Sequence, residues 1–359
     1  MPRITDLTFS AFDVALREPF GIATGTQHIA QNVLVRLVLE DGSEGLGEAA
    51  PFPAVNGETQ AAVLAALPDA KLAITGQPAE RYRVVAHALR EVLQEVPSAR
   101  AAVETALLDA LCKSAGISLW KFFGGAETSL MTDVTVPTGD PARAKHAAER
   151  AARDGFRTLK VKVGGSPLEV DLERLALVHE AAPNAELVLD ANGSLNADSA
   201  LELIERMGAA REQLVLFEQP TAAEDWDGLD AVGRNGHVPV AADESVRSAG
   251  DVARLAAARV VSVVNIKITK SGIMEAWDMI ATARAHGLGL MVGGMVETEL
   301  AMTTSACLAA GIGGFRFVDL DTPLFMAERP LEGGFRQVGP HLALNEIALG
   351  HGVRYSAAR

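Results

Sequence analysis

Hydrophobic and polar positions alternate with the period of a β-strand in the first fifty residues. Residues 32–39 are rich in β-branched and aliphatic side chains, and Asp41-Gly42 separates them from a second such run at 45–50. An Asp-Gly pair between two such runs is typical of a β-hairpin. Further along, apolar positions repeat with helical spacing, best at 98–112, where we expect Ser98 to cap the helix. The first third of the chain is therefore predicted to be an antiparallel sheet followed by helices.

Past residue 125, short apolar runs alternate with Ala-rich amphipathic stretches. Asp140-Pro141 is predicted to open a helix that Gly155 closes, and residues 158–163 follow as a strand. Further helices are predicted at 251–258 and 274–285. With a run near 133–137, the predicted strands number eight, and the last six end at Asp190, Glu218, Asp243, Lys267, Gly293 and Asp319. Because parallel strands joined by helices close into a ring at about eight units, we predict an α/β fold, a modified TIM-type β/α barrel.

The same pattern divides the chain into three segments. Residues 1–125 are predicted to form an α+β capping domain, and residues 126–321 the β/α barrel with the catalytic centre. Residues 322–359 contain Gly333-Gly334 and an alternating run at 341–344. We expect this C-terminal segment to return to the capping domain, which both ends of the chain would then build.

Composition excludes several kinds of protein. Among 359 residues, 32 Lys and Arg face 46 Asp and Glu, a formal net charge of −14. This charge argues against a nucleic-acid partner, because basic side chains supply that affinity. Two cysteines without a CxxC pair, no signal-peptide core and no run near the roughly 20 residues of a membrane span indicate a cytoplasmic protein without a membrane partner. The expected partner is a small-molecule substrate, and a homo-oligomer stays open.

Lysines occupy the ends of two predicted strands, where barrel enzymes carry their chemistry. Lys160 and Lys162 are two residues apart and share one side of their strand. We expect that side to be the barrel interior, because the residues between and beside them are aliphatic and suit the side under the helices. Lys267 ends a strand roughly opposite, after Asn265 on the same side. Two amines are thus predicted on opposite sides of one cavity.

Carboxylates end three consecutive predicted strands, at Asp190, Glu218 and Asp243. Neighbouring strands should bring them together, and three converging anions need a cation. A site made of oxygen ligands suits Mg²⁺. We therefore predict these three residues as magnesium ligands, with Asn192 and Asn265 supporting them.

Three further acidic residues follow the last two strands. Glu297 comes after Gly293-Gly294, and Asp319 and Asp321 form a D-x-D pair. Such a pair can bind a second metal, a sugar hydroxyl or an ammonium group. The residues alone leave these alternatives open.

Taken together, the K-x-K pair, the Asp/Glu/Asp series and the later lysine resemble the enolase superfamily, in its muconate-lactonizing-enzyme subgroup. Within that subgroup, the D-x-D at Asp319 and Asp321 looks like that of the dipeptide epimerases. The resemblance implies that this pair holds the ammonium group of a dipeptide, with Lys160, Glu297 and Thr24 also contacting substrate. Relatives that act on L-Ala-D/L-Glu commonly carry an Arg near residues 20–25, where this chain has none. A Glu-containing dipeptide is therefore not favoured.

The resemblance implies a Mg²⁺-dependent isomerase, a dipeptide epimerase that inverts the α-carbon beside the C-terminal carboxylate. Lys162 would remove a proton from one face and Lys267 return one to the other, and the reverse reaction would exchange their roles. We expect burial and nearby cations to lower the pKa of these bases from about 10.4 toward about 7–8. Alternatives are an N-acylamino acid racemase, o-succinylbenzoate synthase or muconate cycloisomerase of the same subgroup, and, more distantly, a Schiff-base barrel aldolase.

Overall fold

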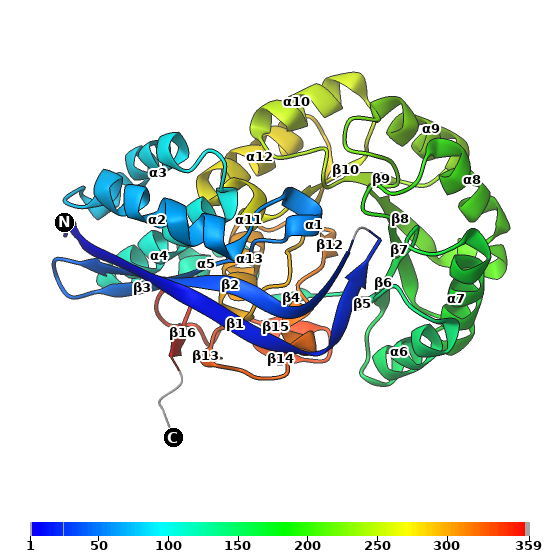
Figure 1. Cartoon of the computed structure of the whole chain (residues 1–359), viewed down its shortest axis with the longest axis horizontal. Coiled ribbons are helices and arrows are strands. Elements are labelled where there is room, and N and C mark those ends of the chain that lie inside the picture. The colour runs from blue at the N-terminus through cyan, green and yellow to red at the C-terminus, as the bar shows by residue number, and fades with distance from the viewer. Residues whose placement is uncertain (1, 24, 356–359) are drawn as a thin grey trace.

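The computed structural model describes residues 2–23 and 25–355 (Figure 1). Its N-terminal part is an antiparallel sheet in the order β1-β2-β3. These strands span Ile4–Ile22, Gly25–Leu39 and Glu44–Ala49. The predicted hairpin is confirmed by the pairing of β2 with β3. Strand β2 begins earlier than predicted because it also pairs along the length of β1.

Helices cover one face of this sheet. They are α1 (Pro53–Asn56), α2 (Gln60–Ile74), the 3-10 turn η1 (Ala79–Arg81), α3 (Tyr82–Val92), α4 (Pro97–Ser114) and α5 (Leu119–Phe122). Helix α4 is almost wholly buried. Gly45 and Gly47 allow β3 to lie directly on it, since a Cβ at either position would fall 1.9 Å from a carbonyl oxygen of α4. The cap predicted at Ser98 is wrong: Pro97 begins the helix, and the Ser98 backbone N–H and hydroxyl both donate to Glu58.

Eight parallel strands form the second part, in the sequential order β5 to β12. They span Val134–Val136, Thr158–Lys162, Glu186–Asp190, Leu214–Glu218, Val240–Ala242, Val263–Ile266, Gly289–Val292 and Phe317–Val318. The Asp133 N–H donates to the carbonyl of Val318 at 2.9 Å, which joins the first strand to the last. The predicted fold class, a β/α barrel with an antiparallel N-terminal cap, is therefore confirmed.

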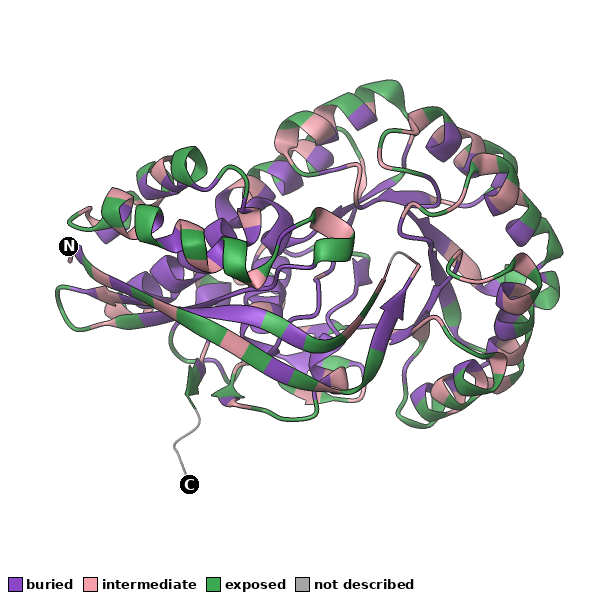
Figure 2. Ribbon diagram, in the orientation of Figure 1, coloured by how far each residue is buried: buried purple, intermediate pink, exposed green. Residues whose placement is uncertain are grey.

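Helices follow the strands and surround the barrel on its outer side (Figure 1). They are α6 (Pro141–Arg153), α7 (Leu168–Ala181), α8 (Ala197–Arg206), the 3-10 turn η2 (Gly208–Gln213), α9 (Trp226–Gly236), α10 (Ala249–Ala258), α11 (Ile268–Ser271), α12 (Ile273–Ala285) and α13 (Glu299–Ile312). Asp140 caps α6, as its position before Pro141 predicts. Figure 2 shows exposed residues on the outward faces of these helices and buried residues along the strands. Strand β12 is followed by only a 3-10 turn, η3 (Thr322–Phe325).

The barrel interior has an apolar floor beneath a charged layer. The floor is a buried cluster with members on six consecutive strands, namely Val188, Leu216, Ala241, Val263, Met291 and Phe317. Because side chains alternate along a strand, the residue two positions later faces the same interior. These next positions include Asp190, Glu218 and Asp243, all buried. Along the three strands that carry them, an apolar interior residue is therefore followed, two positions later, by a polar one at the mouth of the barrel.

The C-terminal segment returns toward both other parts of the molecule. Its strands are β13 (Leu331–Gly333), β14 (Arg336–Val338), β15 (His341–Ala343) and β16 (Val353–Tyr355), and β15 pairs with β4 (Ser129–Met131). The carbonyl of Gly350 accepts from Leu119 N–H at 2.7 Å, and His351 N–H donates to Asp109 of α4 at 3.0 Å. Within the described ranges, no helix combines the length and apolarity needed to cross a bilayer.

Candidate active site

The predicted lysines meet at one buried cavity at the carboxyl ends of the strands. Lys160, Lys162 and Lys267 all line it, as do Asp319 and Asp321. Its remaining walls come from the cap and from loops of the barrel: Phe20, Ile22, Phe52, Val55, Thr135, Asn192, Gly294, Met295, Val296 and Thr322. Its volume is about 30 Å³, room for no more than one or two water molecules. The predicted contact Thr24 lies outside the described residues.

Lys160 is at the centre of the charged layer. Its Nζ lies 2.7 Å from Asp319 Oδ2, 2.8 Å from Glu218 Oε2 and 3.0 Å from Asp190 Oδ2. Burial alone would lower its pKa, but the three carboxylates outweigh burial and hold the pKa well above the ordinary value. Lys162, by contrast, has a single carboxylate partner. Its Nζ contacts Asp190 Oδ2 at 2.6 Å, and its second partner is the neutral amide oxygen of Asn192 at 3.2 Å.

Lys267, across the barrel, is paired with Asp243. Its Nζ donates to Asp243 Oδ2 at 2.7 Å. Burial by itself would lower the pKa of Lys267. The charges of Asp243 and Glu218 raise this pKa by more than burial lowers it, so the net shift is upward. The expectation of a lowered pKa is therefore wrong for Lys267 in this arrangement. The pairing keeps this side chain an ammonium group, a proton donor.

Lys270 is a functional candidate that the sequence patterns did not single out. It is 7% exposed, and its Nζ donates to the other Asp243 oxygen at 2.5 Å and to the Asp243 carbonyl at 2.6 Å. The short helix α11 turns it back under Lys267. Lys270 follows Lys267 by three residues, about one helical turn, and this spacing could have placed both side chains on one side of a helix. Nothing in the sequence showed that a helix begins directly after Lys267.

The three predicted metal ligands stand at adjacent strand ends, but lysines separate them. Asp190 and Glu218 both face Lys160 Nζ, whereas Asp243 turns to Lys267 and Lys270. Lysine charges hold the pKa of Asp190 and Asp243 below the ordinary value despite burial. Burial and the charge of Asp190 instead raise the pKa of Glu218 to about 7.

Among the described residues, the group of three acidic side chains whose oxygens all approach within 4.8 Å of one another is a different set. These are Asp133, Asp319 and Asp321, where β12 meets β5. Asp321 Oδ2 accepts from Thr135 N–H at 2.5 Å, and its Oδ1 is buried without a hydrogen-bond partner, like Asp133 Oδ1. Burial and the charge of Asp319 raise the pKa of Asp321 to about 7. Asp133 was missed because it precedes its strand instead of ending it.

The two predicted supporting amides contact the carboxylates directly. Asn265 Nδ2 donates to Glu218 Oε1 at 2.7 Å, and Asn192 N–H donates to Asp190 Oδ1 at 2.9 Å. Asn192 Nδ2 also donates to Glu244 at 3.3 Å. Glu244 is a partly buried residue that directly follows Asp243 and that the sequence patterns did not single out. Burial and the charge of Asp243 raise the pKa of Glu244 to about 7.

Glu297 does not line the cavity. Its Oε1 accepts from Met295 N–H at 3.1 Å, within its own loop. Burial and the nearby charge of Glu48 raise the pKa of Glu297 to about 8. A direct contact with substrate, as the sequence predicted, would require this carboxylate to leave the loop backbone.

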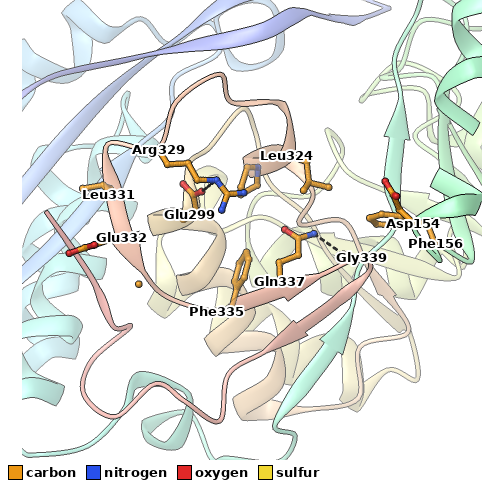
Figure 3. A pocket seen from close by; sticks show the side chains of 12 residues that line it. Asp154, Phe156, Glu299, Leu324, Arg329, Leu331, Glu332, Phe335, Gln337 and Gly339 are labelled. Carbon is orange, nitrogen blue, oxygen red and sulfur yellow. Dashed lines mark hydrogen bonds and ion pairs between the residues drawn. The ribbon is translucent and has the colours of Figure 1, made fainter. Parts of the chain in front are cut away.

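A larger cavity, about 590 Å³, lies elsewhere, between the C-terminal segment and the start of β6 (Figure 3). Arg329 and Glu299 form an ion pair in its wall at 2.9 Å, and Gln337 donates to the carbonyl of Gly339. Of the four charged residues that line it, Asp154, Arg329 and Glu332 are exposed to solvent and only Glu299 is buried. The chemistry therefore belongs to the smaller cavity, where buried lysines and carboxylates converge.

The fold is a β/α barrel with an N-terminal cap, and its cavity has amines on opposite sides and carboxylates in its wall. These features together indicate an enzyme of the capped β/α-barrel class. The family "Mandelate racemase / muconate lactonizing enzyme, N-terminal domain" matches residues 4–124, and "Enolase C-terminal domain-like" matches residues 142–359. The chain belongs to this mandelate racemase / muconate lactonizing enzyme family of the enolase superfamily. The assignment drawn from the lysine and carboxylate series is thereby confirmed.

Relatives with named activities are similar over nearly the whole chain. The aromatic dipeptide epimerase of Herpetosiphon aurantiacus is 47% identical over 350 residues, 98% of each chain. The L-Ala-D/L-Glu epimerase of Thermotoga maritima is 35% identical over 346 residues, 96% of this chain and 100% of the relative. The crystal structure of a dipeptide epimerase from Enterococcus faecalis with Mg and L-Leu-L-Tyr matches with a TM-score of 0.93 at 31% identity, covering 98% of this chain and 100% of that one.

Proposed function

We propose that the protein is a dipeptide epimerase that inverts the α-carbon next to the C-terminal carboxylate. One observation carries the proposal. Lys162 ends β6 and Lys267 follows β10, four strands apart in a ring of eight, so they face the same cavity from opposite sides. Inversion at carbon needs a proton acceptor on one face and a proton donor on the other, which this placement supplies.

The proton balance uses both side chains. The neutral amine of Lys162 takes the α-proton from one face of the substrate and becomes an ammonium group. The ammonium group of Lys267, which Asp243 stabilises, gives a proton to the opposite face of the same carbon. The electron pair left by the first proton is held on the adjoining carboxylate in between. In the reverse direction the two lysines exchange roles.

The donor set at the ends of β7, β8 and β9 suits a hard divalent cation. Asp190 and Glu218 already converge on one positive charge, that of Lys160, whose Nζ lies 3.0 Å from Asp190 Oδ2 and 2.8 Å from Glu218 Oε2, and carboxylate oxygens are the ligands that such a cation prefers. Asp190, Glu218 and Asp243 would hold Mg²⁺. The bound ion would supply positive charge that stabilises the negative charge developing on the substrate carboxylate.

The opposite wall of the cavity supports a dipeptide with a free amine. Asp319 and Asp321 line the cavity and would pair with a substrate ammonium group, which N-acylated amino acids lack. Phe20, Ile22 and Phe52 from the cap supply apolar contacts for side chains. None of the described residues lining the cavity is an arginine, so apolar or aromatic dipeptides are favoured over those with Glu.

Substrate entry requires the cap to move, because a dipeptide does not fit in about 30 Å³. The β1–β2 hairpin reaches from the cap over the barrel mouth (Figure 1). It is held there by a hydrogen bond from Thr138 N–H to Gly21 O at 3.3 Å. Closure over a bound dipeptide would exclude water from the reacting carbon.

The proposal is tested by incubating the enzyme and Mg²⁺ with a dipeptide library in D₂O and following mass and configuration. We expect one deuteron to enter the C-terminal residue of apolar dipeptides, together with epimerisation. N-acetylated copies of the same dipeptides are the control and should react more slowly. Efficient turnover of N-acylamino acids without turnover of dipeptides would instead indicate a racemase. Inactivation by borohydride in the presence of a carbonyl substrate would indicate a Schiff-base aldolase.

A further inference from the structure

A buried carboxylate joins the cap to the loop between β11 and α13. Glu48, on β3, is 4% exposed. Its Oε1 accepts from Asn32 Nδ2 at 2.6 Å and from Thr298 N–H at 3.0 Å. Its Oε2 accepts from the Thr298 hydroxyl at 2.6 Å and from Ala301 N–H at 3.3 Å. Four donors thus surround one side chain, and three of them belong to the barrel.

The start of a helix offsets part of the cost of burying Glu48, although burial still raises the pKa of this carboxyl above its ordinary value. Thr298 caps α13, and Ala301 is in its first turn, where backbone N–H groups lack partners within the helix. A carboxylate at this end is favoured by the helix dipole and by charge-assisted hydrogen bonds. Asn32 adds a second tie, because its Nδ2 also donates to Val296 O at 3.0 Å. Two side chains of the cap therefore fix both ends of the segment 296–298.

This loop is in contact with Lys267. Gly293 begins the loop, and a Cβ added there would lie 3.1 Å from Lys267 Cε and 3.0 Å from the Asn265 amide. The loop backbone therefore lies directly against the Lys267 side chain, and its residues Gly294, Met295 and Val296 continue along the cavity wall. The partners of Lys162, by contrast, are on β7 and just after it. A shift of the loop would move one of the two lysines.

We propose that Glu48 is a positioning residue for Lys267: by holding the β11–α13 loop, the cap fixes the amine that serves one face of the substrate. The inference rests on the proposed two-base reaction. Glu48 itself touches neither lysine nor the cavity. A displacement of about 1 Å in a reacting group can lower a rate about a hundredfold, so a small change in the loop has a measurable effect.

The test is the rate of α-proton exchange in D₂O, measured separately from each epimer of one dipeptide. Lys267→Ala and Lys162→Ala first identify which epimer each lysine serves. Glu48→Gln keeps the size of the side chain but places an NH₂ group against donors. We expect exchange on the Lys267 face to fall about tenfold or more, and exchange on the Lys162 face to change less than about twofold. The KM should stay near that of the wild type.

Three further variants keep the test independent of folding. Thr298→Val removes the hydroxyl donor to Glu48 and should lower exchange on the Lys267 face by less than Glu48→Gln does. Thr298→Ser keeps this hydroxyl and should exchange at close to the wild-type rate on that face. Glu44→Gln, on the same strand but exposed and paired with Arg36, should change neither face.

Equal losses on both faces in Glu48→Gln and Thr298→Val would show a merely structural role and overturn the proposal, as would no loss in either. A wild-type enzyme that exchanges neither epimer would instead refute the proposed function and this inference with it. If each lysine variant silences its own face while the Glu48 variant affects both alike, the function stands and the positioning role fails.

Discussion

The two sides of the barrel mouth each carry three buried acidic residues, but in different electrostatic surroundings. On the side formed by β6 to β10, Asp190, Glu218 and Asp243 contact Lys160, Lys162, Lys267 and Lys270. On the side where β12 meets β5, Asp133, Asp319 and Asp321 share a single contact with Lys160, made by Asp319. We refer to these as the lysine-rich side and the acidic side.

The difference shows in the pKa of the aspartates. Burial by itself raises the pKa of a carboxyl, but lysines reverse this for Asp190 and Asp243. On the acidic side, burial and neighbouring carboxylates act together and raise the pKa of Asp133 and Asp321. An excess of buried negative charge favours a cationic ligand, and this supports a dipeptide bound with its ammonium group toward Asp319 and Asp321.

Removing either proposed base should have the largest effect. We expect Lys162→Ala and Lys267→Ala each to lower epimerisation by about 10³-fold, because general acid–base groups contribute about 10²–10⁴. Deuterium exchange from one epimer should persist in each variant, and the persisting epimer should differ between them. Lys71→Ala, at an exposed lysine of α2, is the control. Normal interconversion in either variant would contradict the two-base reaction.

The same Asp→Asn change should depend differently on pH on the two sides. Asp190 has a lowered pKa and stabilises the fold above about pH 4. Asp190→Asn should therefore cost about 3–5 kcal/mol at both pH 5 and pH 8, because it leaves the buried Lys162 without an anionic partner and removes one of the three carboxylates around Lys160.

Asp321, with a pKa of about 7, retains a proton in the folded state that the unfolded chain has already lost. Its contribution to stability therefore falls as the pH rises from about 4 to 7. Asp321→Asn should be more favourable relative to wild type at pH 8 than at pH 5, by about 1–3 kcal/mol. Urea unfolding at both pH values measures these changes, with the exposed Asp278→Asn as control. Parallel changes in the two variants would remove the contrast between the sides.

Added Mg²⁺ should locate the ion on the lysine-rich side. At a hundredfold excess over its dissociation constant, a ligand bound only by the folded state stabilises it by about 2.7 kcal/mol. We expect this gain in wild type and in Asp133→Asn, and its loss in Asp243→Asn. A chelator should abolish epimerase activity. The reverse pattern of variants would place the ion among Asp133, Asp319 and Asp321.

The smallest expected effect concerns substrate selection. Asp319→Asn should lower kcat/KM for dipeptides with a free amine about tenfold to a hundredfold more than for their N-acetylated copies. Because Asp319 also contacts Lys160, a loss common to both substrates is expected, and the ratio is the informative quantity. An unchanged ratio would remove the argument for ammonium binding on the acidic side.

The strand ends could be predicted because alternation along a strand is a local property. Lys160, Lys162 and Asp190 each follow an aliphatic residue on a strand whose outer side is covered by helices, and a period of two fixes their side. The hairpin at Asp41-Gly42 and the start of α6 at Asp140 were equally readable, since turn and cap chemistry are also local.

What the sequence did not show depends on contacts between distant segments. Lys270 reaches Asp243 only because α11 turns at that point, and Asp133 joins the acidic side only because the first and last strands meet. Glu48 contacts Thr298 across 250 residues. Ser98 resembled a helix cap, but its hydroxyl and N–H are used by Glu58, and Pro97 begins the helix. No pattern of neighbouring residues contains these pairings.

The hydrogen bond between Asp133 N–H and Val318 O lies at the seam where the ring of strands closes, and Thr135 N–H reaches Asp321 across the same seam. The pocket proposed for the substrate amine is thus built from both ends of the sheet and exists only after the ring has closed. An unclosed folding intermediate would lack it, however complete its other strands. A dipeptide bound there would contact residues from both ends of the sheet, and it would therefore stabilise the junction between the first and last barrel strands against opening.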